Sequence, residues 1–184
     1  MKVLETKRLI LRWFTPDDAS FVYELLNEPA WKRYIGDRGI DSVEAARDYI
    51  ETVPIASYRR HGFGLFAVEL KANGTLVGMC GLIKRNVLKD VDIGFALVSR
   101  FEGHGLAHEA AAATLVYSRN TLGLDRVVAI TSLDNERSAR LLERLGMRYE
   151  RLVCLSDDAE QLRLYSITLR PGENMALVPD TTST

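Results

Sequence analysis

Cysteine and histidine are scarce in this sequence, which argues against a disulfide-stapled or metal-dependent fold. The two cysteines, Cys80 and Cys154, lie far apart, and neither belongs to a C-x-x-C pair that would indicate a zinc site or a redox motif. Both lie in apolar runs, so we expect two buried free thiols. His104 and His108 are four residues apart, but no third ligand accompanies them. We therefore expect no metal.

Long apolar runs and a charge of one sign are also missing. No stretch approaches the length of a membrane span, and the first residues lack the apolar segment of a signal peptide, so we expect a cytoplasmic protein without membrane contact. The 24 basic and 25 acidic residues give a net charge of −1, which argues against broad nucleic-acid binding. The 184 residues, 47% of them hydrophobic, suit a single domain. We place this domain at residues 1–170 and expect residues 171–184 to form a tail that can be disordered.

The spacing of apolar residues predicts an α/β (α+β) fold. Helices are expected after the capping residues Thr15, Ser42 and Asn135 and after Gly105. Residues 28–41 read as a loop, and Asn73-Gly74 reads as a two-residue type I′ turn. The expected strands are residues 9–11, 63–70, 76–83, 91–98, 126–133, 152–155 and 162–169. Because residues 92–133 form a strand–helix–strand unit, its two strands should be parallel within a mixed, mostly antiparallel sheet of about seven strands flanked by helices.

A glycine-rich turn separates the strand that ends near Val98 from the next helix. Gly103 and Gly105 let the backbone curl, so that free N–H groups at the helix N-terminus can face an anion such as a diphosphate. Arg100 adds a positive charge. Alone, the pattern fits any tight strand-to-helix turn. It is not a Walker A loop, because no G-K-S/T sequence follows, and it lacks the third glycine of the dinucleotide fingerprint.

At these residues the chain resembles the GNAT superfamily of N-acetyltransferases. Residues 100–105, R-F-E-G-H-G, match its Q/R-x-x-G-x-G/A signature at each specified position. Residues 135–138, N-E-R-S, followed by Leu145-Gly146-Met147, are similar to the family's Asn-x-x-Ser/Ala helix and its Leu-Gly-Phe ending, with Met147 in place of the aromatic residue. Residues 6–12 are similar to the opening of the Rim-type branch, which includes ribosomal-protein N-terminal acetyltransferases. The resemblance spans residues 4–169.

The resemblance implies a cofactor and a place for it. The strands at 91–98 and 126–133 should splay apart and hold acetyl-CoA, with the pantetheine arm in the wedge and the pyrophosphate on the N–H groups of the loop. The residues that the resemblance assigns to the cofactor are Leu97, Val98, Arg100, Gly103, His104, Gly105, Leu106, Ala107, Asn135 and Ser138.

Catalytic roles are also implied by the resemblance. The family reaction is attack of a neutral amine on the thioester, with a backbone N–H near Leu97 stabilising the oxyanion. Asp92, on the same strand face as Gly94 and Ala96, is the candidate base acting through water. A surface carboxylate is the other interpretation of Asp92, and Asp90 is a weaker rival.

Ser138 is the candidate group for the leaving thiolate, because the tyrosine that many members carry four residues later is Leu142 here. The alternative is a hydroxyl that bonds backbone in the first helical turn. Asn135 can be an N-cap, a pantetheine contact, or both. Trp31 and Tyr34 lie where the family places acceptor-binding residues.

We therefore predict an enzyme that acetylates a primary amine, with a protein N-terminal α-amine as the expected acceptor. A small-molecule amine is the alternative acceptor, and a non-catalytic acyl-CoA-binding module is the alternative class. No direct nucleic-acid partner is expected. Exposed sheet edges would allow a homodimer.

Overall fold

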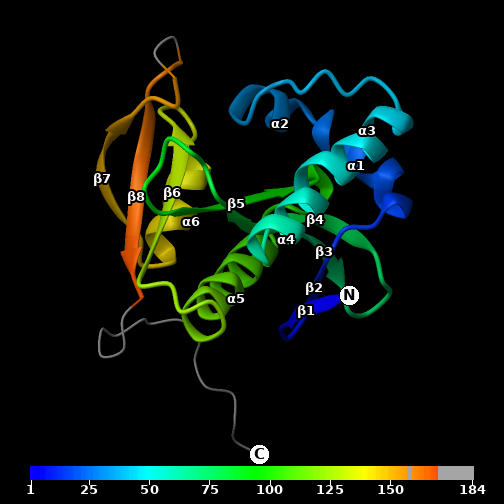
Figure 1. The fold of residues 1–184 in the computed structure, drawn as a ribbon, viewed down its shortest axis with the longest axis horizontal. Helices are drawn as coiled ribbons and strands as arrows, with labels where there is room; N and C mark the ends of the chain where they lie inside the picture. Colours follow the sequence, from blue (N-terminus) through cyan, green and yellow to red (C-terminus); the bar gives the residue numbers. More distant parts are fainter. Residues whose placement is uncertain (157–158, 170–184) are drawn as a thin grey trace, which may run out of the picture.

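An eight-stranded mixed sheet forms the centre of the structure (Figure 1). The structure, a computed structural model, describes residues 1–156 and 159–169. The strand order is β1-β2-β3-β4-β5-β6-β8-β7, and the only parallel neighbours among these strands are β5 and β6. The strands are β1 (Lys2–Glu5), β2 (Leu9–Arg12), β3 (Leu65–Leu70), β4 (Leu76–Ile83), β5 (Val91–Leu97), β6 (Arg126–Ser132), β7 (Arg148–Val153) and β8 (Leu162–Thr168). The mixed sheet and its parallel pair are therefore confirmed, while the expected tail lies outside the described residues.

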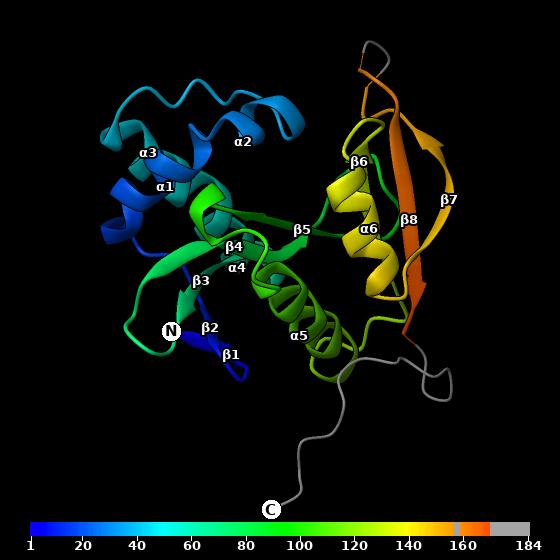
Figure 2. The ribbon, with the colours of Figure 1, turned by 180° about the vertical axis from the view of Figure 1, so that it is seen from behind.

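Helices cover the sheet, and Figure 2 shows α6 lying along β6 and β8. The helical elements are η1 (Pro16–Asp18), α1 (Ala19–Leu26), α2 (Pro29–Tyr34), α3 (Val43–Ile50), η2 (Glu51–Ile55), α4 (Ala56–His61), η3 (Ser99–Phe101), α5 (Leu106–Asn120) and α6 (Glu136–Arg144). The predicted caps are present at two of them: the Ser42 side chain accepts the N–H of Ala45, and the Asn135 side chain accepts the N–H of Ser138. Among the described helices, none combines the length and apolar character needed to span a membrane.

Three elements differ from the sequence prediction. Residues 28–41 are not all loop, because α2 begins at Pro29 and buries Trp31. The helix after Ser42 does not stop at Ile50 but continues to His61 through the π-helical turn η2, where Pro54 lacks an N–H to donate. Strand β1 was not predicted. It is a short edge strand that pairs with β2, and its four residues alone carry no pattern that predicts this pairing.

The two predicted hairpins also differ in detail. Residues 71–75 join β3 to β4, so the connection at Asn73-Gly74 is longer than a two-residue turn, although Gly74 has the expected positive φ of 72°. Strand β7 occupies Arg148–Val153 rather than residues 152–155. Cys154 follows its end and is exposed, so the prediction of a buried thiol is wrong there, whereas Cys80 is buried in β4. Residues 157–158, between the last two predicted strands, lie outside the described residues.

The sheet separates two hydrophobic cores. One contains α5 and α6 packed on the sheet, with Phe66, Leu115 and Leu142 among its fully buried side chains. The other contains α1, α2 and α3 packed around Met79 and Val98. A ligand that enters between β5 and β6 can therefore be reached from both sides of the sheet.

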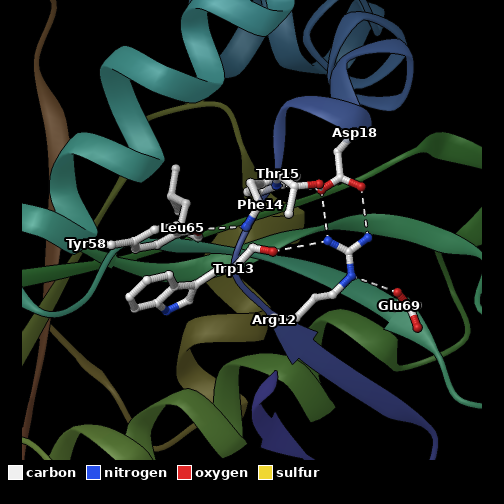
Figure 3. Close-up of polar contacts among 8 residues, drawn as sticks. All are labelled: Arg12, Trp13, Phe14, Thr15, Asp18, Tyr58, Leu65 and Glu69. Atoms are coloured by element: carbon white, nitrogen blue, oxygen red, sulfur yellow. Dashed lines mark hydrogen bonds and ion pairs between the residues drawn. The ribbon is translucent and has the colours of Figure 1, made fainter. Parts of the chain in front are cut away.

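A partly buried ion-pair network joins the second strand to the first helical elements (Figure 3). Arg12 donates from Nη1 and Nη2 to both carboxylate oxygens of Asp18 at 2.8 Å, and from Nε to Glu69 at 2.9 Å. Asp18 also accepts the N–H of Thr15 at 2.9 Å, which closes the predicted capping box. Burial alone raises the pKa of Asp18, but the bonds from Arg12 and Thr15 outweigh it and hold that pKa below its usual value.

Replacing Arg12 by methionine should lower the free energy of unfolding by about 3 kcal/mol at pH 7, because Asp18 would stay buried without its cation. The exposed pair of Lys2 and Glu5 provides a control, since Lys2→Gln should cost about 1 kcal/mol or less.

The stabilisation by Arg12 and Asp18 should also depend on pH. Because the pKa of Asp18 is lowered, this pair stabilises the fold above the usual carboxyl pKa and loses this effect as pH falls through the lowered value. Urea unfolding at pH 7 and below pH ~4 measures both effects, and equal losses for Arg12→Met and Lys2→Gln at pH 7 would contradict the assignment.

Candidate active site

The parallel pairing of β5 with β6 covers only two residue pairs, near the start of both strands. Val91 pairs with Val127 and Asp92 with Val128, and no later pair follows along the two strands as the structure describes them. Strand β5 stays paired with β4 as far as Leu97, while β6 stays paired with β8 as far as Ser132. The two strands therefore diverge after Asp92, as Figure 1 shows, and the splayed pair predicted for the cofactor is present.

The backbone of β5 presents free hydrogen-bonding groups to this wedge. The N–H of Val98 donates to Val77 of β4 at 3.0 Å. Because successive N–H groups along a strand point to opposite edges, the N–H of Leu97 points away from β4 and toward the wedge. It is thus available to a ligand between β5 and β6, which is where the oxyanion donor is expected.

The loop before α5 presents a second set of free donors. Gly103 and Gly105 have positive φ angles of 80° and 75°, which glycine adopts without strain. Within the described part of the chain, the backbone N–H groups from Gly103 to His108 have no hydrogen-bond acceptor. They lie at the positive end of the fifteen-residue helix α5. This arrangement is a binding site for an anion.

A cleft of about 640 Å³ extends from the wedge between β5 and β6 to the loop before α5 and to α2, which carries Trp31 and Tyr34. Most of the residues predicted for the site line it. They are Trp31, Tyr34, Asp92, Leu97, Gly103, Gly105, Leu106, Ala107, Asn135 and Ser138.

Unpartnered polar groups gather in this cleft. Among the described residues, the buried side-chain nitrogen and oxygen atoms that lack a hydrogen-bond partner are Trp31 Nε1, Asp92 Oδ1 and Thr131 Oγ1, and all three residues line the cleft. A buried polar atom without a partner costs about 1–3 kcal/mol. A donor, an acceptor and a hydroxyl left in this state indicate a site built for a polar ligand.

Asp92 lies at the point of divergence and is only 1% exposed, so the interpretation as a surface carboxylate is wrong. Its Oδ2 accepts a bond of 2.6 Å from Nε of Arg85. Burial raises the pKa of Asp92 to about 6, against the opposing effect of Arg85. A carboxylate with this pKa can exchange a proton near neutral pH. Its rival Asp90 is instead paired with Arg126 and does not line the cleft.

Asn135 and Ser138 face each other at the start of α6. Asn135 is the N-cap, since its Oδ1 accepts the N–H of Ser138 at 3.1 Å. The Ser138 hydroxyl has no partner among the residues that the structure describes, so it is free to donate into the cleft. Capping therefore occupies one atom of Asn135 and leaves its amide nitrogen available.

Three residues predicted for the cofactor do not line the cleft. Val98 is buried in the core beside α1, because its side chain lies on the opposite face of β5 from Leu97. Arg100 pairs with Glu24 of α1 and lies over the ring of Phe101. The side chain of His104 is exposed to solvent. Any role of these three side chains in cofactor binding remains a prediction.

The end of the cleft that Trp31 and Tyr34 line is formed by α2, which is joined to the opposite side by side-chain contacts. Arg33 pairs with Asp134 at 2.8 Å, and the Ser132 hydroxyl donates to the Tyr34 carbonyl at 3.3 Å. Closer to the loop, Arg137 of α6 pairs with Glu102 at 2.7 Å. These contacts join the β5 and β6 sides across the cleft.

The sequence analysis missed several charged residues that line the cleft. Arg137, Arg140 and Arg144 recur along α6 at helical spacing, a pattern that was visible in the sequence. Arg38 and Arg85 lie in loops that only the fold brings to the cleft. Elsewhere, no cluster of three or more histidine, cysteine or acidic side chains within residues 1–156 and 159–169 has the arrangement of a metal site.

This chain is similar in sequence and in fold to known proteins. Residues 8–148 match the family described as acetyltransferase (GNAT) domain. The uncharacterised N-acetyltransferase YoaA of Bacillus subtilis (strain 168) is 30% identical over 151 residues, which cover 80% of this chain and 84% of YoaA. YdaF of the same organism, provisionally named a ribosomal N-acetyltransferase, is 28% identical over 149 residues, covering 78% and 80%.

Among solved structures, RimL, a ribosomal L7/L12 alpha-N-protein acetyltransferase in complex with coenzyme A, superposes with a TM-score of 0.79. The two share 17% identity, and the match covers 92% of this chain and 98% of RimL, so it shows a common fold. Since the family match over residues 8–148 includes both the divergence of β5 from β6 and the anion-binding loop, this chain belongs to the GNAT family of acetyltransferases.

Proposed function

We propose that this enzyme uses acetyl-CoA to acetylate a primary amine, and that the acceptor is a protein N-terminal α-amine. The observation that carries the proposal is that the buried unpartnered polar side chains and the free N–H groups of the loop line a single cleft. The coenzyme A bound by RimL and the name of YdaF support the cofactor and the class of acceptor.

The chain offers contacts for each part of coenzyme A. The N–H groups from Gly103 to His108 suit the pyrophosphate. The three arginines of α6 that line the cleft add positive charge for the remaining phosphate. The pantetheine arm, which contains amides, would lie in the wedge and pair with β5 near Leu97, as an added strand does.

The residues of the wedge fit direct transfer. Asp92 as a carboxylate would accept the proton of the attacking amine through water. The N–H of Leu97 would donate to the thioester oxygen as negative charge develops there, a contribution of about 10²–10³ in rate. The Ser138 hydroxyl would donate to the departing thiolate. Alignment of the two substrates would supply much of the remaining acceleration.

The acceptor end of the cleft favours an amine that is followed by polar or acidic groups. Trp31 Nε1 is a free donor suited to the first carbonyl of a peptide. Arg38 lines the same end of the cleft and has no ion-pair partner in the described ranges. Arg85 also lines the cleft and forms an ion pair with Asp92. Positive charge there repels a polyamine and attracts an acidic peptide. Because α2 covers this end of the cleft, a small amine is the second candidate for the acceptor.

Acetylation of an amine panel should separate these acceptors. We expect the highest kcat/KM for peptides with a free N-terminus and an acidic second or third residue, and little activity toward polyamines. The release of coenzyme A thiol measures the rates. The matched control is the same peptide with a blocked N-terminus and one internal lysine. Transfer to the blocked peptide or to an amino sugar at equal or higher kcat/KM would contradict the proposed acceptor.

Gly103→Asp should weaken acetyl-CoA binding at least tenfold, because it introduces a carboxylate among the N–H groups that face the diphosphate. A Cβ at Gly103 meets no atom within 4 Å, so the substitution leaves the packing intact. Gly103→Ala introduces the same strain at positive φ without the charge and is the matched control. Calorimetric titration with acetyl-CoA measures both, and equal affinities for the two variants would contradict an anion site at this loop.

Asp92→Asn should reduce kcat by about 10²–10⁴ if the carboxylate is the base. Since its raised pKa is about 6, wild-type kcat/KM should increase as pH rises through 6, where the carboxylate forms, and the variant should lack this dependence. Burial of the charged form also disfavours folding of the wild type above pH 6, so the uncharged variant should be at least as stable as the wild type there. A pH–rate profile retained by Asp92→Asn would exclude Asp92 as the base.

A further inference from the structure

A hydrogen-bonded network connects the N-terminal segment to the first turn of α5. Thr6 donates from Oγ1 to Glu109 Oε1 at 2.6 Å, and the N–H of Arg8 donates to the same oxygen at 2.8 Å. Arg8 Nε donates to Glu109 Oε2 at 2.6 Å. Both carboxylate oxygens are therefore occupied. The side chain of Glu109 is 19% exposed and that of Arg8 is 44% exposed, so the bond from Thr6 is partly buried while those from Arg8 lie at the surface.

The same guanidinium also holds the loop. Arg8 Nη1 donates to the carbonyl of His104 at 2.9 Å. Its Nη2 lies close behind the next residue, since a Cβ placed on Gly105 would be 3.5 Å from it. Gly103 and Gly105 line the cleft, whereas Arg8 does not. Arg8 therefore contacts the loop from the side opposite the ligand.

This contact determines which way one peptide group points. The peptide between His104 and Gly105 is trans, so its C=O and N–H point in opposite directions. With the carbonyl held toward Arg8, the N–H of Gly105 is turned away from Arg8. Glycines flank His104 on both sides, and their conformational freedom would otherwise let this peptide rotate and turn its carbonyl toward the phosphates.

We propose that Thr6, Arg8 and Glu109 form a positioning network that fixes the peptide between His104 and Gly105, so that the loop presents N–H groups to the pyrophosphate of acetyl-CoA. This inference rests on the proposed acetyl-CoA site. Arg8 is not itself proposed as a phosphate ligand, because it does not line the cleft and its Nε and Nη1 donate to a carboxylate and a carbonyl. The network also accounts for the Thr6 and Arg8 positions of the N-terminal Rim-like segment.

A donor without the pyrophosphate separates this role from simple structural support. S-acetylpantetheine keeps the thioester and the pantetheine arm but has no ADP moiety. Arg8→Met should lower kcat/KM with acetyl-CoA about tenfold, the loss of one good contact to the pyrophosphate. The same substitution should change kcat/KM with S-acetylpantetheine by less than about twofold, because this donor has no phosphate to contact the loop.

The matched control is Arg126→Gln, because Arg126, like Arg8, holds two acceptor groups with its guanidinium, here the carboxylates of Asp90 and Glu150, but lies away from the cleft. It should leave both donors unaffected. Glu109→Gln keeps the packing and weakens the hold on Arg8, so it should reproduce the donor-selective loss if Arg8→Met does not fold. Equal losses with both donors, or no loss with acetyl-CoA, would overturn the network's role. A wild type that does not prefer acetyl-CoA to S-acetylpantetheine would instead reject the proposed cofactor site.

Discussion

The divergence of β5 from β6 is the constraint on which the site depends. Beyond Val91 and Asp92 the two strands no longer pair with each other, so the backbone groups of β5 that face the wedge are left without a strand partner, although β5 stays paired with β4 and β6 with β8. Such groups are costly to bury unpaired, and a ligand that itself carries amides can bond to them. The divergence also places Asp92 at the edge of the cleft.

Contacts between distant residues keep this opening in shape. The pairs Arg33–Asp134 and Arg137–Glu102 cross the cleft at its two ends. They are exposed, and each contributes little stability alone. The fold is stabilised mainly by apolar packing and by the partly buried contacts of Arg12.

Local sequence was sufficient for some features and not for others. The loop at Gly103 and Gly105, the caps at Ser42 and Asn135 and the strand of Asp92 depend on neighbours in the chain, and the structure confirms each of them. Contacts such as that between Arg8 and Glu109, which are 101 residues apart, depend on the assembled sheet and have no local signal. The same holds for β1, which pairs with β2 and packs against the core, and for the loop arginine Arg38. The roles of Asp92 and Ser138 in proton transfer depend on a bound amine and remain predictions.

The central claim is that coenzyme A occupies the wedge between β5 and β6 with its pyrophosphate on the loop before α5. Amide hydrogen exchange, followed residue by residue with and without acetyl-CoA, tests this most directly. The account predicts slower exchange for the amides of residues 103–108 and of Leu97, with little change along β7. Unchanged exchange at the loop and at Leu97 under saturating acetyl-CoA would contradict it.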